Sequence, residues 1–108
     1  MPLKNPTKLY VSGPMSHYEG YNFDAFARAT KELRNVGYEV EDPGEFGVAD
    51  DWDWKDYLRK DLEIVLRVDG IATLPDWQCS KGAQLEVYVA QALSMPVLPW
   101  EVWVKNAR

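Results

Sequence analysis

Hydrophobic and polar positions along this chain follow two different spacings in alternation. Compact apolar runs with the length of buried strands occur at 9–12, 38–40, 71–74 and 96–98. Between them, apolar residues recur three or four positions apart, as on one face of a helix, over about 22–36, 54–68 and 81–93. The pattern therefore predicts strands and helices in strict alternation.

This alternation predicts one α/β domain over residues 1–108, with a mostly parallel sheet flanked by helices. Parallel neighbours need a crossover connection, and each predicted helix is long enough to supply one. Ligands of such sheets bind beyond the carboxyl ends of the strands. We therefore expect a binding site among the loops that follow Ser12, Val40 and Leu74.

Two of the predicted helices have apolar faces that can be assigned residue by residue. The first carries Phe23, Phe26, Ala27, Thr30 and Leu33 on one face, and the second carries a stripe of Trp54, Leu58, Leu62 and Val65. We expect both faces to pack on the sheet. The segment 42–53 before the second helix is rich in Gly, Pro and Asp, and it is long enough to act as a lid.

Composition argues against several classes of function. The chain has 108 residues, a net charge of −5, one Cys and one His. A nucleic-acid surface needs clustered Lys and Arg, and a zinc site needs several Cys or His ligands, so we expect neither. No apolar run approaches the roughly 20 residues that span a membrane, and the first residues lack the apolar core of a signal peptide. We expect a soluble, cytoplasmic protein that binds a small molecule.

The segment from Asp76 to Glu86 carries the strongest chemical signal, at the junction of a predicted strand and helix. Ser80 is suited to cap the helix, and Gly82 allows a ligand to approach the backbone. Glu86 shares a helix face with small apolar residues that should be buried. A helix start of this kind can bind an anion, although an ordinary capped helix has the same pattern.

A second carboxylate, Asp61, borders the apolar stripe of the second helix. One interpretation pairs it with Arg59, Lys60 or a backbone amide at the edge of that stripe. The other pairs it with Glu86, because two carboxylates in different environments can divide the work of breaking a glycosidic bond.

Four motifs together resemble a known family. They are Tyr10–Met15, Tyr21–Phe23, Asp61-Leu62 in the second helix, and Ser80-x-Gly82-Ala83-x-x-Glu86. They resemble the nucleoside 2-deoxyribosyltransferase superfamily and, more narrowly, its small and often phage-borne DUF4406 branch. The resemblance implies a flavodoxin-like or Rossmann-like fold and cleavage of the N-glycosidic bond between a base and ribose or deoxyribose, with no metal or organic cofactor.

The resemblance also implies roles for single residues. Glu86 matches the nucleophile that attacks C1′, Asp61 matches the carboxylate that assists protonation of the base, and Tyr10 matches the tyrosine that orients the nucleophile. The candidate substrate-binding residues are Ser12, Gly13, Pro14, Met15, Asn22, Asp76, Ser80 and Gly82.

Ser80 bears on the substrate class. In this superfamily the residue six before the nucleophile tends to be Asp in transferases of free nucleosides and Ser in hydrolases of nucleoside 5′-monophosphates. A carboxylate there would repel a phosphate, whereas a serine hydroxyl and helix-start amides can donate to it. Ser80 therefore favours a monophosphate substrate.

Two alternatives stay open in the sequence. Val87 follows Glu86 where better-characterised members carry Gly, so a catalytically inactive nucleotide-binding module is the alternative function. The tail Trp100–Val104 contains two tryptophans that would be an exposed patch if left uncovered. We expect a homodimer or higher homo-oligomer to cover them; the alternative is that the tail folds back over its own sheet.

Overall fold

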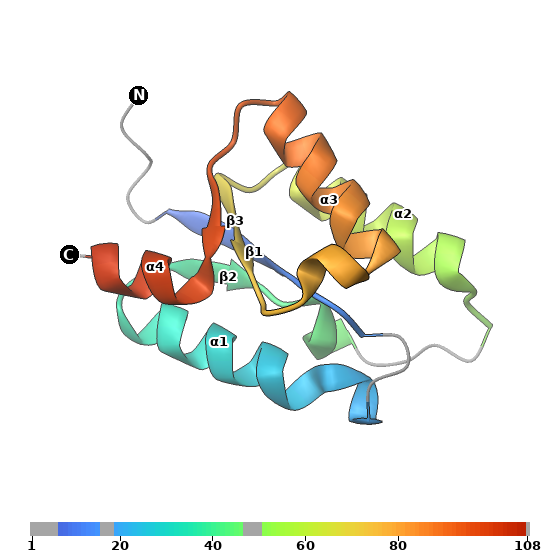
Figure 1. The fold of residues 1–108 in the computed structure, drawn as a ribbon, viewed down its shortest axis with the longest axis horizontal. Helices are drawn as coiled ribbons and strands as arrows, with labels where there is room; N and C mark the ends of the chain where they lie inside the picture. The colour runs from blue at the N-terminus through green and yellow to red at the C-terminus, as the bar shows by residue number, and fades with distance from the viewer. Residues whose placement is uncertain (1–6, 16–18, 47–50, 108) are drawn as a thin grey trace.

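The computed structural model describes residues 7–15, 19–46 and 51–107. Its strands are β1 (Lys8–Ser12), β2 (Glu39–Glu41), β3 (Gly70–Thr73) and β4 (Val97–Pro99), in the order β2-β1-β3-β4. Every neighbouring pair is parallel. The predicted α/β fold with a parallel sheet is confirmed, and its topology is flavodoxin-like (Figure 1).

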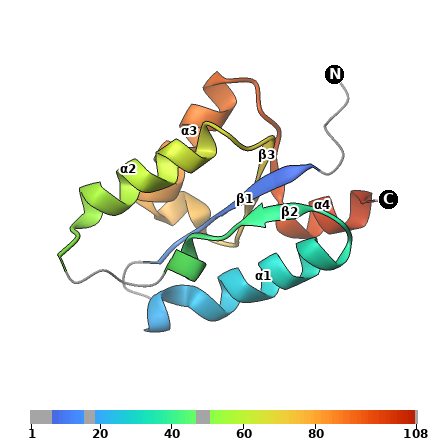
Figure 2. The ribbon, with the colours of Figure 1, turned by 180° about the vertical axis from the view of Figure 1, so that it is seen from behind.

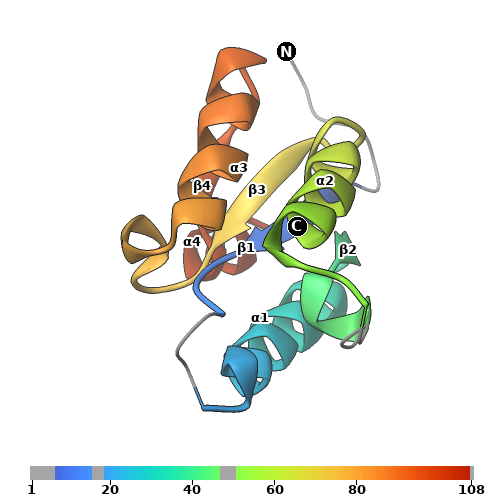
Figure 3. The same ribbon diagram turned by 90° about the vertical axis from the view of Figure 1, so that its right-hand side faces the viewer.

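Helices flank both faces of this sheet. They are α1 (Phe23–Asn35), α2 (Trp54–Val65), α3 (Lys81–Ala92) and α4 (Trp100–Asn106). Helices α1 and α4 cover one face, and α2 and α3 cover the other (Figures 2 and 3). Short 3-10 segments lie at η1 (Glu19–Asn22), η2 (Pro43–Phe46) and η3 (Trp77–Cys79). None of the described helices is long and apolar enough to cross a membrane.

The strand order creates a switch point at β1. The chain leaves β1 toward β2 on one side and later crosses to β3 on the other. Because crossovers in parallel sheets are right-handed, this reversal puts α1 and α2 on opposite faces. The carboxyl ends of β1 and β3 therefore lie side by side where the helices diverge, which is the usual ligand crevice of such sheets.

Strand β1 contributes to both faces because successive side chains of a strand point in opposite directions. Leu9 and Val11 pack with the α1 and α4 side chains in one hydrophobic cluster. Tyr10 packs with Val65 and Ile71 in the second cluster, under α2 and α3. By the same alternation Ser12 lies on the α2–α3 face, at the carboxyl end of the strand.

Three expectations about the helices need correction. Ala27 is exposed and Ala29 is buried in its place, because the buried face of α1 is centred on Phe26, Thr30 and Leu33. Trp54 is 43% exposed rather than part of a buried stripe. It is the first residue of α2, which begins beyond the edge of the sheet (Figure 2). Helix α2 also ends at Val65 instead of 68, in a turn at Leu66.

The segment expected to form a lid is only partly described. Residues 43–46 form η2, and 47–50 lie outside the described residues, so the lid stays a prediction. At the end of this segment Asp53 and Asp56 form a capping box, in which each side chain bonds the other residue's backbone amide. This exchange starts α2 at a defined residue.

The C-terminal tail folds back over the chain's own sheet, as the alternative interpretation expected. It forms helix α4, and Trp103 is only 4% exposed. The Trp103 indole Nε1 donates to the Ile71 carbonyl at 2.8 Å, and Tyr38 donates to the Trp103 carbonyl at 2.7 Å. A Cβ at Gly70 would lie 2.9 Å from the Trp103 ring, so Gly70 makes room for it. Because the chain itself covers Trp103, the tail gives no argument for oligomerisation.

Replacing Trp103 by Ala should destabilise the protein by about 3–5 kcal/mol, because it leaves a cavity and removes the indole hydrogen bond to the Ile71 carbonyl. The matched control is Trp52→Ala at an exposed position, with an expected cost below about 1 kcal/mol. Chemical denaturation of both variants measures the difference. Equal losses of unfolding free energy would contradict the placement of α4 in the core.

Candidate active site

Four polar side chains meet at the switch point of the sheet. Tyr10 and Ser12 come from β1, Asp61 from α2 and Glu86 from α3. Helices α2 and α3 pack against each other, and both lie on the same face of the sheet (Figure 3). Both pairing interpretations of Asp61 were open in the sequence, and the structure brings Asp61 to Glu86.

Glu86 accepts a hydrogen bond on each of its carboxylate oxygens. The Tyr10 hydroxyl donates to Oε2 at 2.9 Å, and the Ser12 hydroxyl donates to Oε1 at 2.6 Å. Glu86 is 5% exposed, Tyr10 1% and Ser12 0%. A buried carboxylate is costly unless its oxygens are paired, and here two hydroxyls of one strand pair both oxygens.

The environment raises the pKa of both carboxyls. Burial raises the pKa of Glu86 to about 8, helped by the nearby charge of Asp61 and opposed by the hydrogen bonds from Ser12 and Tyr10. Burial raises the pKa of Asp61 to about 6, opposed by hydrogen bonding with Glu86 and Tyr10 and by the charge of Lys60. The two groups interact strongly, so the ionisations belong to the pair. Near neutral pH the pair holds one shared proton.

Tyr10 acts as a fixed donor to this pair. Burial and the charges of Glu86 and Asp61 raise the pKa of its phenol well above the ordinary value. The phenol therefore keeps its proton throughout the physiological range. Within the described residues no group of three or more His, Cys, Asp or Glu side chains is placed to hold a metal ion.

Helix α3, which carries Glu86, begins at a capped N-terminus six residues earlier. Ser80 is the N-cap, and its hydroxyl oxygen accepts from the Ala83 amide at 3.2 Å. The Lys81 ammonium lies 5.3 Å from the centre of the Trp54 ring. A Cβ at Gly82 would make only ordinary contact with the Trp54 indole at 3.7 Å, so packing within the chain does not require this glycine.

The other predicted substrate-binding residues build the loop after β1 or lie near η3. A Cβ at Gly13 would meet Leu74 at 2.6 Å, so this glycine allows the close approach of two loops. Asn22 has a left-handed backbone, and its side-chain amide donates to the Pro14 carbonyl at 2.9 Å. Met15 packs partly buried against the α1–α4 cluster, and Asp76 is exposed at the start of η3.

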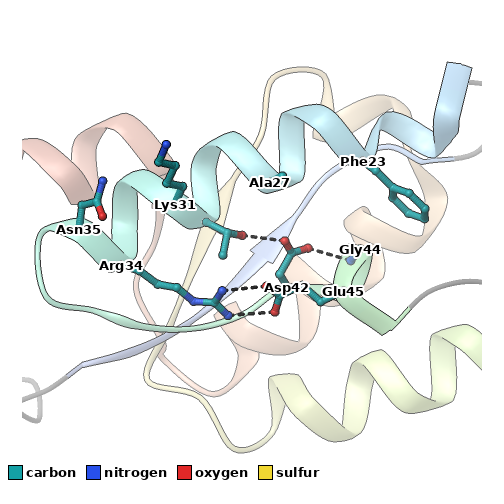
Figure 4. A pocket seen from close by; sticks show the side chains of 9 residues that line it. Phe23, Ala27, Lys31, Arg34, Asn35, Asp42, Gly44 and Glu45 are labelled. Carbon is teal, nitrogen blue, oxygen red and sulfur yellow. Dashed lines mark hydrogen bonds and ion pairs between the residues drawn. The ribbon is translucent and has the colours of Figure 1, made fainter.

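The structure also has a cavity that sequence reasoning did not predict. About 450 Å³ in volume, it lies between α1 and η2, on the α1 side of β2 (Figure 4). Asp42 is buried there and accepts from the Thr30 hydroxyl at 2.9 Å and from the Gly44 amide at 2.7 Å. Arg34 makes a bidentate bond to Glu45 at the cavity edge. Burial raises the pKa of Asp42, whose hydrogen bonds tie η2 to α1.

The fold and this site define an α/β protein of flavodoxin-like topology with a pair of neighbouring carboxyls, one of them buried, at its switch point. Residues 7–99 match the domain of unknown function DUF4406, and the chain therefore belongs to this family, as its motifs predicted. A comparison with curated proteins finds no match.

Among solved structures, the chain is similar to a 2-deoxyribosyltransferase from the psychrotolerant bacterium Bacillus psychrosaccharolyticus, described as a biocatalyst for the synthesis of antiviral and antitumoral nucleosides. The TM-score is 0.66 at 21% identity, over 84% of this chain and 70% of that chain. At this identity the similarity establishes a shared fold.

Replacing Glu86 by Gln should stabilise the protein at alkaline pH. A carboxyl whose pKa is raised by folding binds its proton more tightly in the folded state, so wild-type stability falls as pH rises from the ordinary value of 4.5 through about 8. Gln removes this loss. At pH 9 we expect the variant to melt at least about 5 °C higher, with a smaller difference at pH 5.

The control for that measurement is Glu63→Gln, which removes an exposed carboxylate from α2. Its melting temperature should follow the wild type at every pH. A Glu86→Gln curve parallel to the wild-type curve between pH 5 and 9 would contradict a raised pKa at Glu86.

Proposed function

We propose that this protein cleaves the N-glycosidic bond of a (2′-deoxy)nucleoside 5′-monophosphate, with Glu86 as the nucleophile. The observation that carries the proposal is the Glu86–Asp61 pair, in which buried Glu86 accepts from two hydroxyls of β1 at the carboxyl end of the strand, where ligands of such sheets bind. The fold shared with a 2-deoxyribosyltransferase supports the same reaction class.

The shared proton of the pair provides both groups that the reaction needs. In one arrangement the proton lies on Asp61 and the charge on Glu86. The Glu86 carboxylate then attacks C1′ and forms a glycosyl ester, while the C1′–N bond breaks and its electron pair stays with the base. Asp61 donates the proton to the departing base. Water or a second base then attacks C1′ and gives its proton to the Asp61 carboxylate, while the ester bond breaks and releases Glu86 as a carboxylate.

The phosphate preference rests on the start of α3. Ser80 leaves the hydroxyl hydrogen available, because its oxygen accepts from Ala83. Lys81 adds positive charge nearby, and a helix start favours anions through its free amides and dipole. A nucleoside 5′-monophosphate bound with its phosphate here would extend along α3 toward Glu86.

A binding module without turnover is the second candidate. It is favoured by the raised pKa of Glu86, about 8, since a protonated carboxyl is a poor nucleophile. It would use the same crevice and the same helix start to hold a nucleotide. Activity measurements separate the two functions.

The first test is release of free base from a panel of ribonucleoside and deoxyribonucleoside 5′-monophosphates. We expect a bell-shaped dependence of kcat on pH, with limbs near about 6 and 8, because only the singly protonated pair holds both a nucleophile and an acid. Glu86→Ala should lower kcat at least about 1,000-fold, and Asp61→Asn about 100-fold or more.

Glu63→Gln on the exposed face of α2 is the control and should keep wild-type kcat. No base release from any substrate, with or without an added acceptor base, combined with unchanged behaviour of Glu86→Ala, would leave the binding module as the function.

The second test exchanges Ser80 for Asp. Asp is as good a helix N-cap as Ser, so the fold should be kept, but its charge would repel a phosphate. KM for a nucleoside 5′-monophosphate should rise about 10-fold or more, with little change for the free nucleoside. Ser80→Asn, which caps the helix without a charge, is the matched control. Equal effects of Ser80→Asp on both substrates would argue against a phosphate at this position.

A further inference from the structure

Ser12 was expected among the substrate-binding residues, but its hydroxyl is directed at Glu86. We propose that Ser12 is a positioning residue that fixes the orientation of the Glu86 carboxylate and stabilises negative charge on Glu86 without stabilising it on Asp61. This inference rests on the proposed function, because it concerns the same nucleophile.

The Ser12 hydroxyl donates its only hydrogen to Glu86. It carries a single hydrogen, which it donates to Glu86 Oε1 at 2.6 Å, a length typical of a hydroxyl bound to a charged carboxylate. Ser12 is also 0% exposed. Because the hydroxyl is buried, water does not compete with Glu86 for its hydrogen. A substrate would have to displace Glu86 to receive the same hydrogen.

The backbone holds this hydroxyl in one place. Ser12 pairs with Thr73 in the parallel ladder, and its carbonyl accepts from the Leu74 amide at 2.9 Å. Directly after it, Gly13 packs so closely on Leu74 that a Cβ would not fit. Glu86 is therefore oriented by a donor that is itself fixed to two strands.

Ser12 differs from Tyr10 in which carboxylate it serves. The Tyr10 hydroxyl donates to Glu86 Oε2, and it also lowers the pKa of Asp61. Ser12 acts on Glu86, and the groups that act on Asp61 are Glu86, Tyr10 and Lys60. A donor to one member of a pair stabilises the charge on that member alone. Ser12 thereby favours the arrangement with the proton on Asp61, which is the arrangement that can attack.

The decisive experiment is a carboxyl-carbon NMR titration of the isotopically labelled protein, comparing wild type with Ser12→Ala. The higher ionisation of the pair, near about 8 in the wild type, should move upward by about one to two pH units when the donor to Glu86 is lost. Tyr10→Phe should move both ionisations, because Tyr10 serves both carboxylates. A Ser12→Ala titration identical to the wild-type titration would overturn the proposal.

Two further variants control for loss of stability and for failure of Ser12→Ala to fold. Thr30→Val removes a buried hydroxyl on the other face of the sheet, so it should lower stability without moving the Glu86 titration. If Ser12→Ala does not fold, Ser12→Cys takes its place, because a thiol is of similar size and a weaker donor. We expect Ser12→Cys to shift the titration in the same direction by a smaller amount. A Thr30→Val shift as large as that of Ser12→Ala would mean that loss of stability alone moves the titration.

Kinetics give an independent readout. Ser12→Ala should lower kcat for a nucleoside 5′-monophosphate about 10- to 100-fold, raise the alkaline limb of the pH profile, and change KM less than about threefold. A rise in KM with unchanged limbs would make Ser12 a substrate contact instead. If the wild type releases no base, the proposed function fails, while the titration still decides whether Ser12 sets the charge of Glu86.

Discussion

Buried Glu86 lies beside the half-buried carboxyl of Asp61, and the surroundings of the pair are arranged around the cost of ionising both groups. Two neighbouring ionised carboxylates repel each other where water screens their charge poorly. The strand hydroxyls of Tyr10 and Ser12 offset part of the cost by bonding both oxygens of Glu86. What remains appears as raised pKa values for Glu86 and Asp61, which are the property that a proton-transferring site uses.

The topology of the sheet supplies the geometry of this pair. Because β1 lies between β2 and β3, the crossover helices α2 and α3 meet over the same face of β1. The pleat of β1 sends Tyr10 to that side, and places Leu9 and Val11 in the opposite core. One short strand thus anchors both halves of the hydrophobic core and also provides the donors of the site.

Sequence spacing predicted the elements and the separate site residues, because those depend on local pattern. The apolar runs gave the strands to within about a residue, and helical spacing singled out Glu86 as a carboxylate on a buried face. The partners of Glu86 depend on the tertiary fold. Ser12 is 74 positions away in the chain, and nothing local distinguishes a hydroxyl that binds substrate from one that binds Glu86.

The same limit explains the errors along the helices and the two interpretations that the sequence left open for the tail. Ala27 and Ala29 are equally apolar, and only the packing of α1 decides which one is buried. Trp103 lies in a segment whose apolar and polar residues alternate, as they do in a strand. The segment nevertheless forms a helix, from which the Trp103 indole donates to the Ile71 carbonyl of β3. Tertiary packing thus overrides a short local pattern.

Helix α3 adds a constraint of its own, because Ser80 and Glu86 lie on one rigid element. The separation between the cap and the carboxylate is set by helix rise at about 9 Å along the axis, whatever the loops do. Any ligand that spanned the cap and Glu86 would therefore have to match this length.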